Sequence, residues 1–197
     1  VMNFACFLAD IGVSIKRVTM SDIGIKPTTF KLILSMCRNV KILELPVLTS
    51  SVTDDILRNL PSLDLDELKG FGGRVLSSQL LQASNVRSIK FINNQIHSLL
   101  NFLMIQKNLE FLHLVGGFRL ELFTSDALNN VDFRLKSFTL AYIAIENAEN
   151  FTKFIDNHAD TLTHVKLIIC SSISILNCLK NVKKIKKLTF EWSEPDD

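Results

Sequence analysis

The chain has 197 residues, of which 47% are hydrophobic and 21% charged, and its formal net charge is +2 at pH 7. This length and composition favour one domain with a packed core and exclude a disordered chain. Only 7 Gly and 4 Pro are present, too little turn chemistry for an all-β sandwich or barrel. The small net charge gives no reason to expect nucleic acid or a membrane as the main partner. No apolar run approaches the roughly 20 residues that span a bilayer.

A pattern of three apolar residues, apolar-x-x-apolar-x-apolar, recurs eight times along the chain and predicts eight short strands. Its first members, in chain order, are Ile15, Val40, Leu60, Val86, Leu109, Leu135, Leu162 and Ile185. The starts are separated by 25, 20, 26, 23, 26, 27 and 23 residues. All seven intervals lie in the window of about 20–29 residues that is typical of leucine-rich repeats.

The segments that precede these strands predict helices, because apolar residues recur in them at helical spacing on one face. Examples are Phe30, Ile33 and Leu34; Leu99, Phe102 and Leu103; and Ile175, Cys178 and Leu179. One helix–strand unit cannot bury its own apolar side, so neighbouring units must stack. We therefore expect a single domain over residues 1–190, followed by an acidic tail over residues 191–197.

The repeated unit resembles that of leucine-rich repeat proteins. The consensus L-x-x-L-x-L-x-x-N/C is met in full at Val86–Asn94 (VRSIKFINN) and at Leu162–Cys170 (LTHVKLIIC). The resemblance implies an α/β solenoid of about seven to eight repeats, a curved right-handed coil with a parallel sheet on its concave face. The other six units lack the Asn or Cys of the ninth position, which implies irregular turns.

The uneven, Phe-rich repeats look like those of F-box/leucine-rich-repeat proteins. The segments that carry this likeness are FACFLADIGVSIKRVTM (4–20) and FTKFIDNHADTLTHVKL (151–167). The resemblance implies that an F-box docks on a Skp-type adaptor of a cullin ubiquitin ligase while the repeats select the substrate. No F-box lies in these residues, so we expect adaptor binding only if one precedes this chain.

No catalytic motif is present, and we expect a protein that is not an enzyme and needs no cofactor. The cluster Gly70, Gly72 and Gly73 is not followed by Lys-Ser/Thr, and it favours a loop turn over a phosphate-binding loop. His158 and His164 are too far apart for one helical face. They predict solvated or locally bonded histidines and no metal site.

The cysteines Cys6, Cys37, Cys170 and Cys178 stand singly in apolar surroundings, which predicts buried free thiols. Whether Cys170 and Cys178 form a disulfide stays an open question.

Val1 to Ile11 lacks a basic region and begins inside a periodic segment, so we expect a fragment without a signal peptide. These features favour an intracellular location, cytoplasmic or nuclear. The sequon at Asn150 keeps an extracellular receptor as an alternative, although that class needs cysteine-rich caps.

Alternate strand positions predict a protein-binding surface, because side chains between the core positions face the opposite side of the sheet. Phe111 is the expected anchor, since aromatic residues dominate binding hot spots. Two alternatives stay open: these side chains cover one another without a partner, or a one-residue shift turns Phe111 inward. The candidate partner-binding residues are Lys90, Ile92, Phe111, His113, Val115, Thr139, His164, Lys166 and Ile168.

Charged residues mark both ends of the expected sheet. Glu44, Asp64 and Asp66 predict an acidic stretch on the same face, with Arg17 before it. The run KKIKK (183–187) predicts a solvated terminal repeat. A basic patch for a nuclear import receptor or for nucleic acid is the alternative, but no aromatic residues interleave the lysines.

Together these patterns predict protein–protein recognition, with substrate selection in an F-box type ubiquitin ligase as the expected role. The alternative is a stand-alone regulatory or inhibitory scaffold that binds its target through the same face. The sequence does not identify the partner, because concave positions of a repeat protein tolerate almost any side chain.

Overall fold

The structure, a computed structural model, describes residues 12–19, 26–45, 64–71, 86–92, 99–116, 123, 126–143, 145, 147–169 and 173–192. Its strands are β1 (Arg17–Thr19), β2 (Ile42–Leu45), β3 (Glu67–Phe71), β4 (Ser88–Ile92), β5 (Phe111–Val115), β6 (Ser137–Ala141), β7 (His164–Ile169) and β8 (Lys187–Trp192). Its α-helices are α2 (Pro27–Met36), α5 (Leu99–Met104) and α6 (Ala148–Asn157). Short 3-10 helices are η1 (Gly12–Ser14), η3 (Ala127–Asn130) and η4 (Ile173–Leu179).

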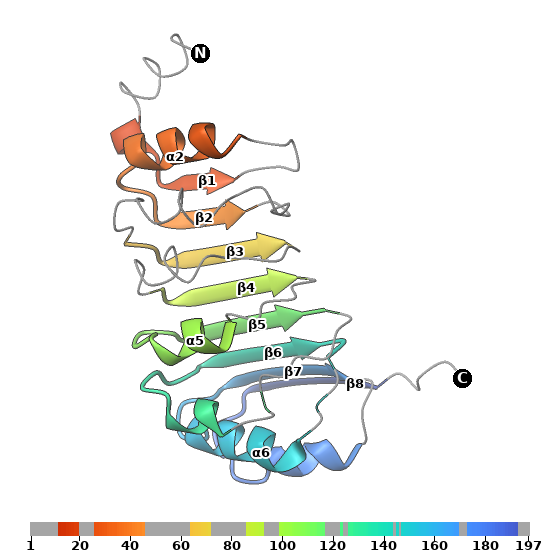
Figure 1. Cartoon of the computed structure of the whole chain (residues 1–197). Helices are drawn as coiled ribbons and strands as arrows, with labels where there is room; N and C mark the ends of the chain where they lie inside the picture. The colour runs from red at the N-terminus through yellow and green to blue at the C-terminus, as the bar shows by residue number, and fades with distance from the viewer. Residues whose placement is uncertain are drawn as a thin grey trace, which may run out of the picture.

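The eight strands form one parallel sheet in which every strand lies beside its neighbours in the sequence, in the order β1 to β8 (Figure 1). Parallel neighbours need a crossover connection, and the chain makes one between each strand and the next. The protein is therefore of the α/β class, as expected. Figure 1 shows the strands as the rungs of a ladder, all running in one direction.

The strand register confirms seven of the eight predicted units. The second apolar residues of these units stand at one level across the sheet: Val18, Leu43, Ile89, Leu112, Phe138, Val165 and Leu188. A shift of one residue would turn a strand's core residues to the other face, so this alignment fixes which side chains point inward.

The predicted register of the third unit is wrong. Leu68 pairs with both Leu43 and Ile89, so the unit begins at Leu65 and not at Leu60. Leu65 and Leu68 are 1% and 0% exposed, because they take the first and second core positions of this unit. The reason is that Leu60, Leu63 and Leu65 satisfy the whole motif, whereas the observed unit has Gly70 at its third core position. Residues 60–63 lie outside the described part of the chain.

Two further expectations change with this register. Gly70 is buried inside β3 and is not in a loop, while Gly72 and Gly73 lie outside the described residues. Asp64 and Asp66 precede β3, so the strand positions expected for them are held by Lys69 and Phe71.

The core lies between the helices and one face of the sheet. Apolar side chains of all three α-helices join those of the strands in a single buried cluster. Around α6 this cluster is built from aromatic rings: Phe151 meets Phe123 edge-on, with ring centroids 4.9 Å apart, and Phe154 meets Phe138 at 5.6 Å. The side chain of Asn147 accepts a hydrogen bond from the Asn150 N–H at 3.0 Å and so caps the start of α6.

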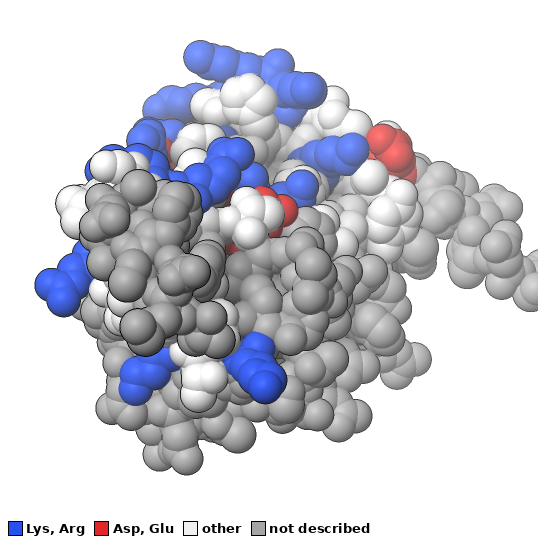
Figure 2. Space-filling view, turned by 90° about the horizontal axis from the view of Figure 1, so that it is seen from above, with Lys and Arg blue, Asp and Glu red and all other residues white. Residues whose placement is uncertain are grey.

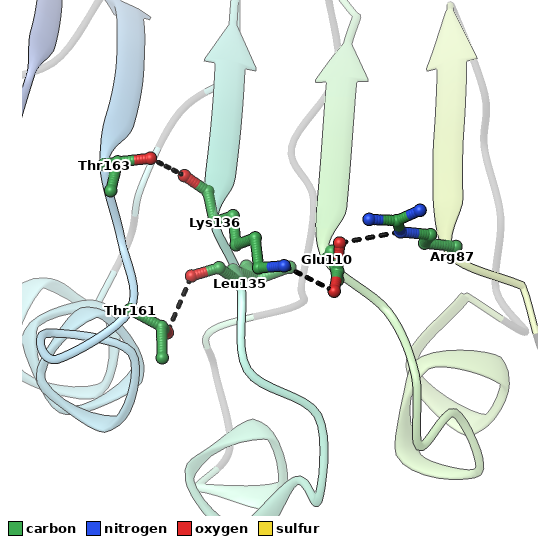
Figure 3. Close-up of polar contacts among 6 residues, drawn as sticks. All are labelled: Arg87, Glu110, Leu135, Lys136, Thr161 and Thr163. Carbon is green, nitrogen blue, oxygen red and sulfur yellow. Dashed lines mark hydrogen bonds and ion pairs between the residues drawn. The ribbon is translucent and has the colours of Figure 1, made fainter.

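Polar contacts join consecutive units at the amino ends of the strands (Figure 3). Glu110 accepts hydrogen bonds from Arg87 Nε and from Lys136 Nζ, each at 2.7 Å. The hydroxyls of Thr161 and Thr163 donate to the carbonyls of Leu135 and Lys136, at 2.8 and 3.0 Å. Each residue reaches across one strand interval, so these contacts hold neighbouring units in register.

The cysteine prediction is confirmed where the structure describes it. Cys37 and Cys178 are buried free thiols, and burial raises the pKa of Cys178 to about 12. Cys6 and Cys170 lie outside the described residues, and with them the open question of a Cys170–Cys178 pair. Among the helices that are described, none combines the length and apolar character needed to cross a membrane.

Candidate protein-binding surface

The face of the sheet opposite the core, here called the open face, carries all nine candidate partner-binding residues. In β4 and β5 the burial alternates residue by residue, as expected when every second side chain points into the core. The register arranges the open face in rows that run across the strands. The middle row, from β1 to β8, is Thr19, Glu44, Lys69, Lys90, His113, Thr139, Lys166 and Thr189.

Phe111 points outward, as predicted, and the alternative of an inward shift is wrong. Its side chain is 38% exposed, and the neighbouring Leu112 takes the core position instead. The Arg87 guanidinium lies 5.8 Å from the centroid of the Phe111 ring, a cation–π contact from the neighbouring unit. Ser88 and Ser137 flank Phe111 on the adjacent strands and leave the ring accessible.

Apart from Phe111, the apolar residues of the candidate set are largely covered by their neighbours. Thr139 and Ile168 are 9% and 7% exposed, although both lie on the open face. Strands only about 4.8 Å apart let neighbouring side chains cover one another, so this part of the alternative interpretation is correct. Ile92 and Val115 are half-buried. Phe111 is therefore the exposed apolar residue of the candidate set, and the cations around it define the rest of the surface.

Positive charge is concentrated in the middle row of the open face. Lys69 pairs with Glu67 at 3.3 Å, and Lys166 lies 3.8 Å from Glu191, whereas Lys90 makes no ion pair with a described residue. Figure 2 shows Lys and Arg side chains gathered along the upper rim of the molecule, with few Asp and Glu among them.

His113 lies within this row, with Lys90 on the strand before it. Burial lowers the pKa of His113, and the positive charges of Lys90 and Lys166 lower it further. The imidazole is therefore neutral at pH 7 and offers one N–H donor and one acceptor nitrogen. The His113 N–H can therefore donate a hydrogen bond to a bound anion, although the imidazole itself carries no positive charge.

A groove of about 240 Å³ opens on the same face over the last three strands. Hydroxyl groups and cations make up most of its lining, which no described carboxylate enters. The polar side chains that line it are Ser137, Thr139, His164, Lys166, Lys187 and Thr189. Lys187 belongs to the KKIKK run, whose four lysines are all exposed.

A second hollow, of about 500 Å³, lies along the amino ends of β3 to β6. Its charges are mixed, and Glu110 already pairs with Arg87 and Lys136 there. Because its lining holds three cations (Arg87, Lys107 and Arg134) among four carboxylates (Asp64, Asp66, Glu110 and Asp132), this hollow favours neither sign of charge strongly.

The two candidate histidines differ in their surroundings. His158 is 0% exposed at the end of α6, so it is locally bonded and not solvated, whereas His164 is exposed at the start of β7. The Nδ1 of His158 accepts a hydrogen bond from the Leu135 N–H at 3.5 Å, and its ring stacks on Phe133 with centroids 5.4 Å apart. Burial lowers the pKa of His158 to about 3. In the described part of the chain, no group of three or more His, Cys, Asp or Glu could hold a metal ion.

Comparison with protein-family models, with curated proteins and with solved structures finds no match for this chain. What the fold and the surface define is an α/β protein with an eight-stranded parallel sheet, whose open face carries a row of cations beside one exposed phenylalanine.

Proposed function

We propose that this chain is a leucine-rich repeat solenoid that recognises a partner protein through the open face of its sheet. The strictly sequential strand order supports the solenoid, because each unit contacts the next along the sheet. The near-constant spacing of the units supports the same fold. In such a fold the open face is the concave side, and extended concave surfaces are what solenoids use for binding.

The exposure of Phe111 is the observation that carries the binding role. A large aromatic side chain at the middle of a sheet face, with serines beside it and a guanidinium over it, has no role in the core. Aromatic and Arg anchors with a polar surround are the usual composition of binding hot spots.

The role that we propose for this recognition is substrate selection in an F-box type ubiquitin ligase. The likeness of the repeats to those of F-box/leucine-rich-repeat proteins supports it. A stand-alone regulatory or inhibitory scaffold would use the same open face and is the second candidate. The two roles differ in one partner, the Skp-type adaptor, which only the ligase requires.

Site-specific photo-crosslinking tests the binding role. A benzophenone side chain is placed at Phe111 and, as the matched control, at Met104, which is 46% exposed at the end of α5. We expect a protein to be captured at position 111 and not at position 104, and Phe111→Asp to abolish binding of that protein. Equal capture at both positions, or full binding by Phe111→Asp, would exclude this face as the binding surface.

The ligase role is tested with the protein expressed from its own full-length transcript. Co-purification of a Skp-type adaptor and a cullin supports substrate selection. A partner bound at Phe111 without either of them identifies the scaffold instead.

A further inference from the structure

Charged side chains form close ion pairs at the amino edge of the sheet, whereas those on the open face are paired weakly or not at all with described residues. At the amino edge, Arg87, Glu110 and Lys136 neutralise one another at 2.7 Å. On the open face, the row of Lys90, His113 and Lys166 contains no carboxylate, and of the described carboxylates Lys166 reaches only Glu191 in the next row, at 3.8 Å. A surface whose cations are paired this weakly gains free energy when an anion binds between them.

We propose that the open face over β4 to β8 binds an acidic segment of the partner protein. Its anionic groups, carboxylate or phosphoryl, lie between Lys90 and Lys166 and enter the groove over β6 to β8. This inference rests on the proposed function, because it takes the open face as the binding surface, and it adds the chemical class of the bound segment.

The register places donors along the whole path of such a segment. Lys90 and Lys166 are three strands apart, or about 14 Å, which an extended chain of about five residues spans. His113 and Thr139 occupy the two intervening positions of the row and offer an N–H and a hydroxyl. Beyond them, Thr189 and Lys187 of β8 continue the donors along the wall of the groove.

The described carboxylates of the open face set the limits of this site. Glu44 and Glu67, on β2 and β3, would repel an acidic segment and so exclude it from that end of the sheet. Glu191, on β8, lies 3.8 Å from Lys166 and competes with the segment for this cation. The site therefore extends from β4 to β8, and removal of the Glu191 charge should make Lys166 more available.

Nucleic acid fits this surface less well than an acidic peptide. Binding of a single strand combines cations with aromatic platforms for successive bases, and within the described strands Phe111 is the aromatic residue whose ring is exposed. Lys90 and Lys166 also lie in one row, which matches one extended peptide.

Fluorescence anisotropy with the full chain tests the proposal. The probes are a labelled octaglutamate peptide, a labelled peptide of the same length with two phosphoserines, a labelled octalysine peptide and a labelled single-stranded RNA. We expect both acidic peptides to bind, the octalysine not to bind, and added salt to weaken the binding of the acidic peptides. The ranking of octaglutamate against the phosphopeptide assigns the anion as carboxylate or phosphoryl.

Two sets of variants make the test specific. The double variant Lys90→Gln/Lys166→Gln should lose about tenfold or more in affinity for the acidic peptides. Lys153→Gln removes the same type of charge from α6, where Lys153 is 54% exposed, and should bind as the unmodified chain does. Glu191→Gln should bind more tightly, a gain that loss of folding cannot produce.

Binding that is equal in the double variant and the unmodified chain, an equal loss in Lys153→Gln, or tighter binding of RNA than of either acidic peptide would overturn the proposal. This failure is separate from that of the proposed function. If a partner is captured at position 111 but the chain does not bind acidic peptides, the proposed function stands and the acidic-segment proposal is rejected.

Discussion

The side-chain oxygen of Gln106 accepts a hydrogen bond from the backbone N–H of Val86, with an N–O distance of 3.1 Å. Val86 is the first core residue of the β4 unit, and Gln106 follows α5 in the next unit. Gln106 is only 1% exposed, so this bond crosses from one unit to the next inside the core. His158 makes the same kind of bond to Leu135 two units further along. Each of these two side-chain bonds satisfies a backbone N–H that lies before a strand and is not paired by the hydrogen bonds of the parallel sheet.

Replacement of Gln106 by Met tests this bond, because Met keeps the size of the side chain and removes the acceptor. The buried Val86 N–H then loses its partner, and we expect the free energy of unfolding to fall by about 2 kcal/mol. Urea denaturation measures the change. Lys183→Met, at an exposed position near the end of the stack, is the control and should leave stability nearly unchanged. Equal losses in both variants would show that the bond contributes nothing of its own.

His158 should make the protein sensitive to mild acid. Its pKa is lowered from 6.5 to about 3 in the folded state by burial and then by Arg134, so the unfolded chain binds the extra proton first. The stabilising contribution is complete above pH 6.5 and is lost as the pH falls from 6.5 towards 3. By pH 5 this amounts to about 2 kcal/mol.

Thermal melts at pH 7 and pH 5 separate His158 from the other titrating groups. The variant His158→Asn keeps an acceptor near the Leu135 N–H and cannot be protonated. We expect it to be less stable than the unmodified chain at pH 7, because it loses the ring contacts with Phe133 and Phe154, but to lose less stability on acidification. Identical losses in both proteins between these pH values would place the acid sensitivity elsewhere.

The sequence predicts this fold well because its strongest signal is periodic. Apolar residues at fixed spacing set the strand positions, and seven units align as the spacing predicts. The third unit fails for the same reason, because Leu60, Leu63 and Leu65 satisfy the whole motif while the observed unit has Gly70 at its third core position. Only the pairing of Leu68 with Leu43 decides between them.

The surface is less predictable, since exposure depends on neighbours that are distant in the sequence. The outward direction of Phe111 follows from alternation alone, whereas the burial of Ile168 depends on the side chains of the flanking strands. Gln106 carries no sequence signal for its role, because a polar residue after a helix is usually solvated. A buried hydrogen bond between units becomes visible only when two segments are placed side by side.

Tyr142 follows β6 with a φ of 58°, in the left-handed region that disfavours residues with a Cβ. Its N–H donates to the Ile168 carbonyl at 2.6 Å, which holds the backbone in this conformation. We expect Tyr142→Gly to be more stable than Tyr142→Ala by about 1 kcal/mol, because both lack the ring and only Ala keeps the strain. Urea denaturation of the two variants gives the difference. A more stable Ala variant would show that the loss of chain entropy at Gly outweighs the strain.

The ion pairs of Glu110 should stabilise the stack of units only modestly. Hydrogen bonds from Lys136 and then Arg87 lower the pKa of Glu110, so its contribution is present above its ordinary pKa of 4.5 and is lost as the pH falls below that value. Lys136 and Arg87 are 50% and 59% exposed, and solvent screens such pairs. We therefore expect Glu110→Gln to lower the free energy of unfolding by no more than about 1 kcal/mol at neutral pH.

Urea denaturation at low and at high salt tests whether this contribution is electrostatic. The difference between Glu110→Gln and the unmodified chain should shrink at about 1 M salt, where the Debye length falls to about 3 Å. Glu149→Gln is the matched control, since Glu149 pairs with Lys153 within α6 and joins no two units. A loss in Glu110→Gln that persists at high salt would mean that Glu110 acts through the shape of its hydrogen bonds, because salt leaves packing and geometry unchanged and screens only the charge.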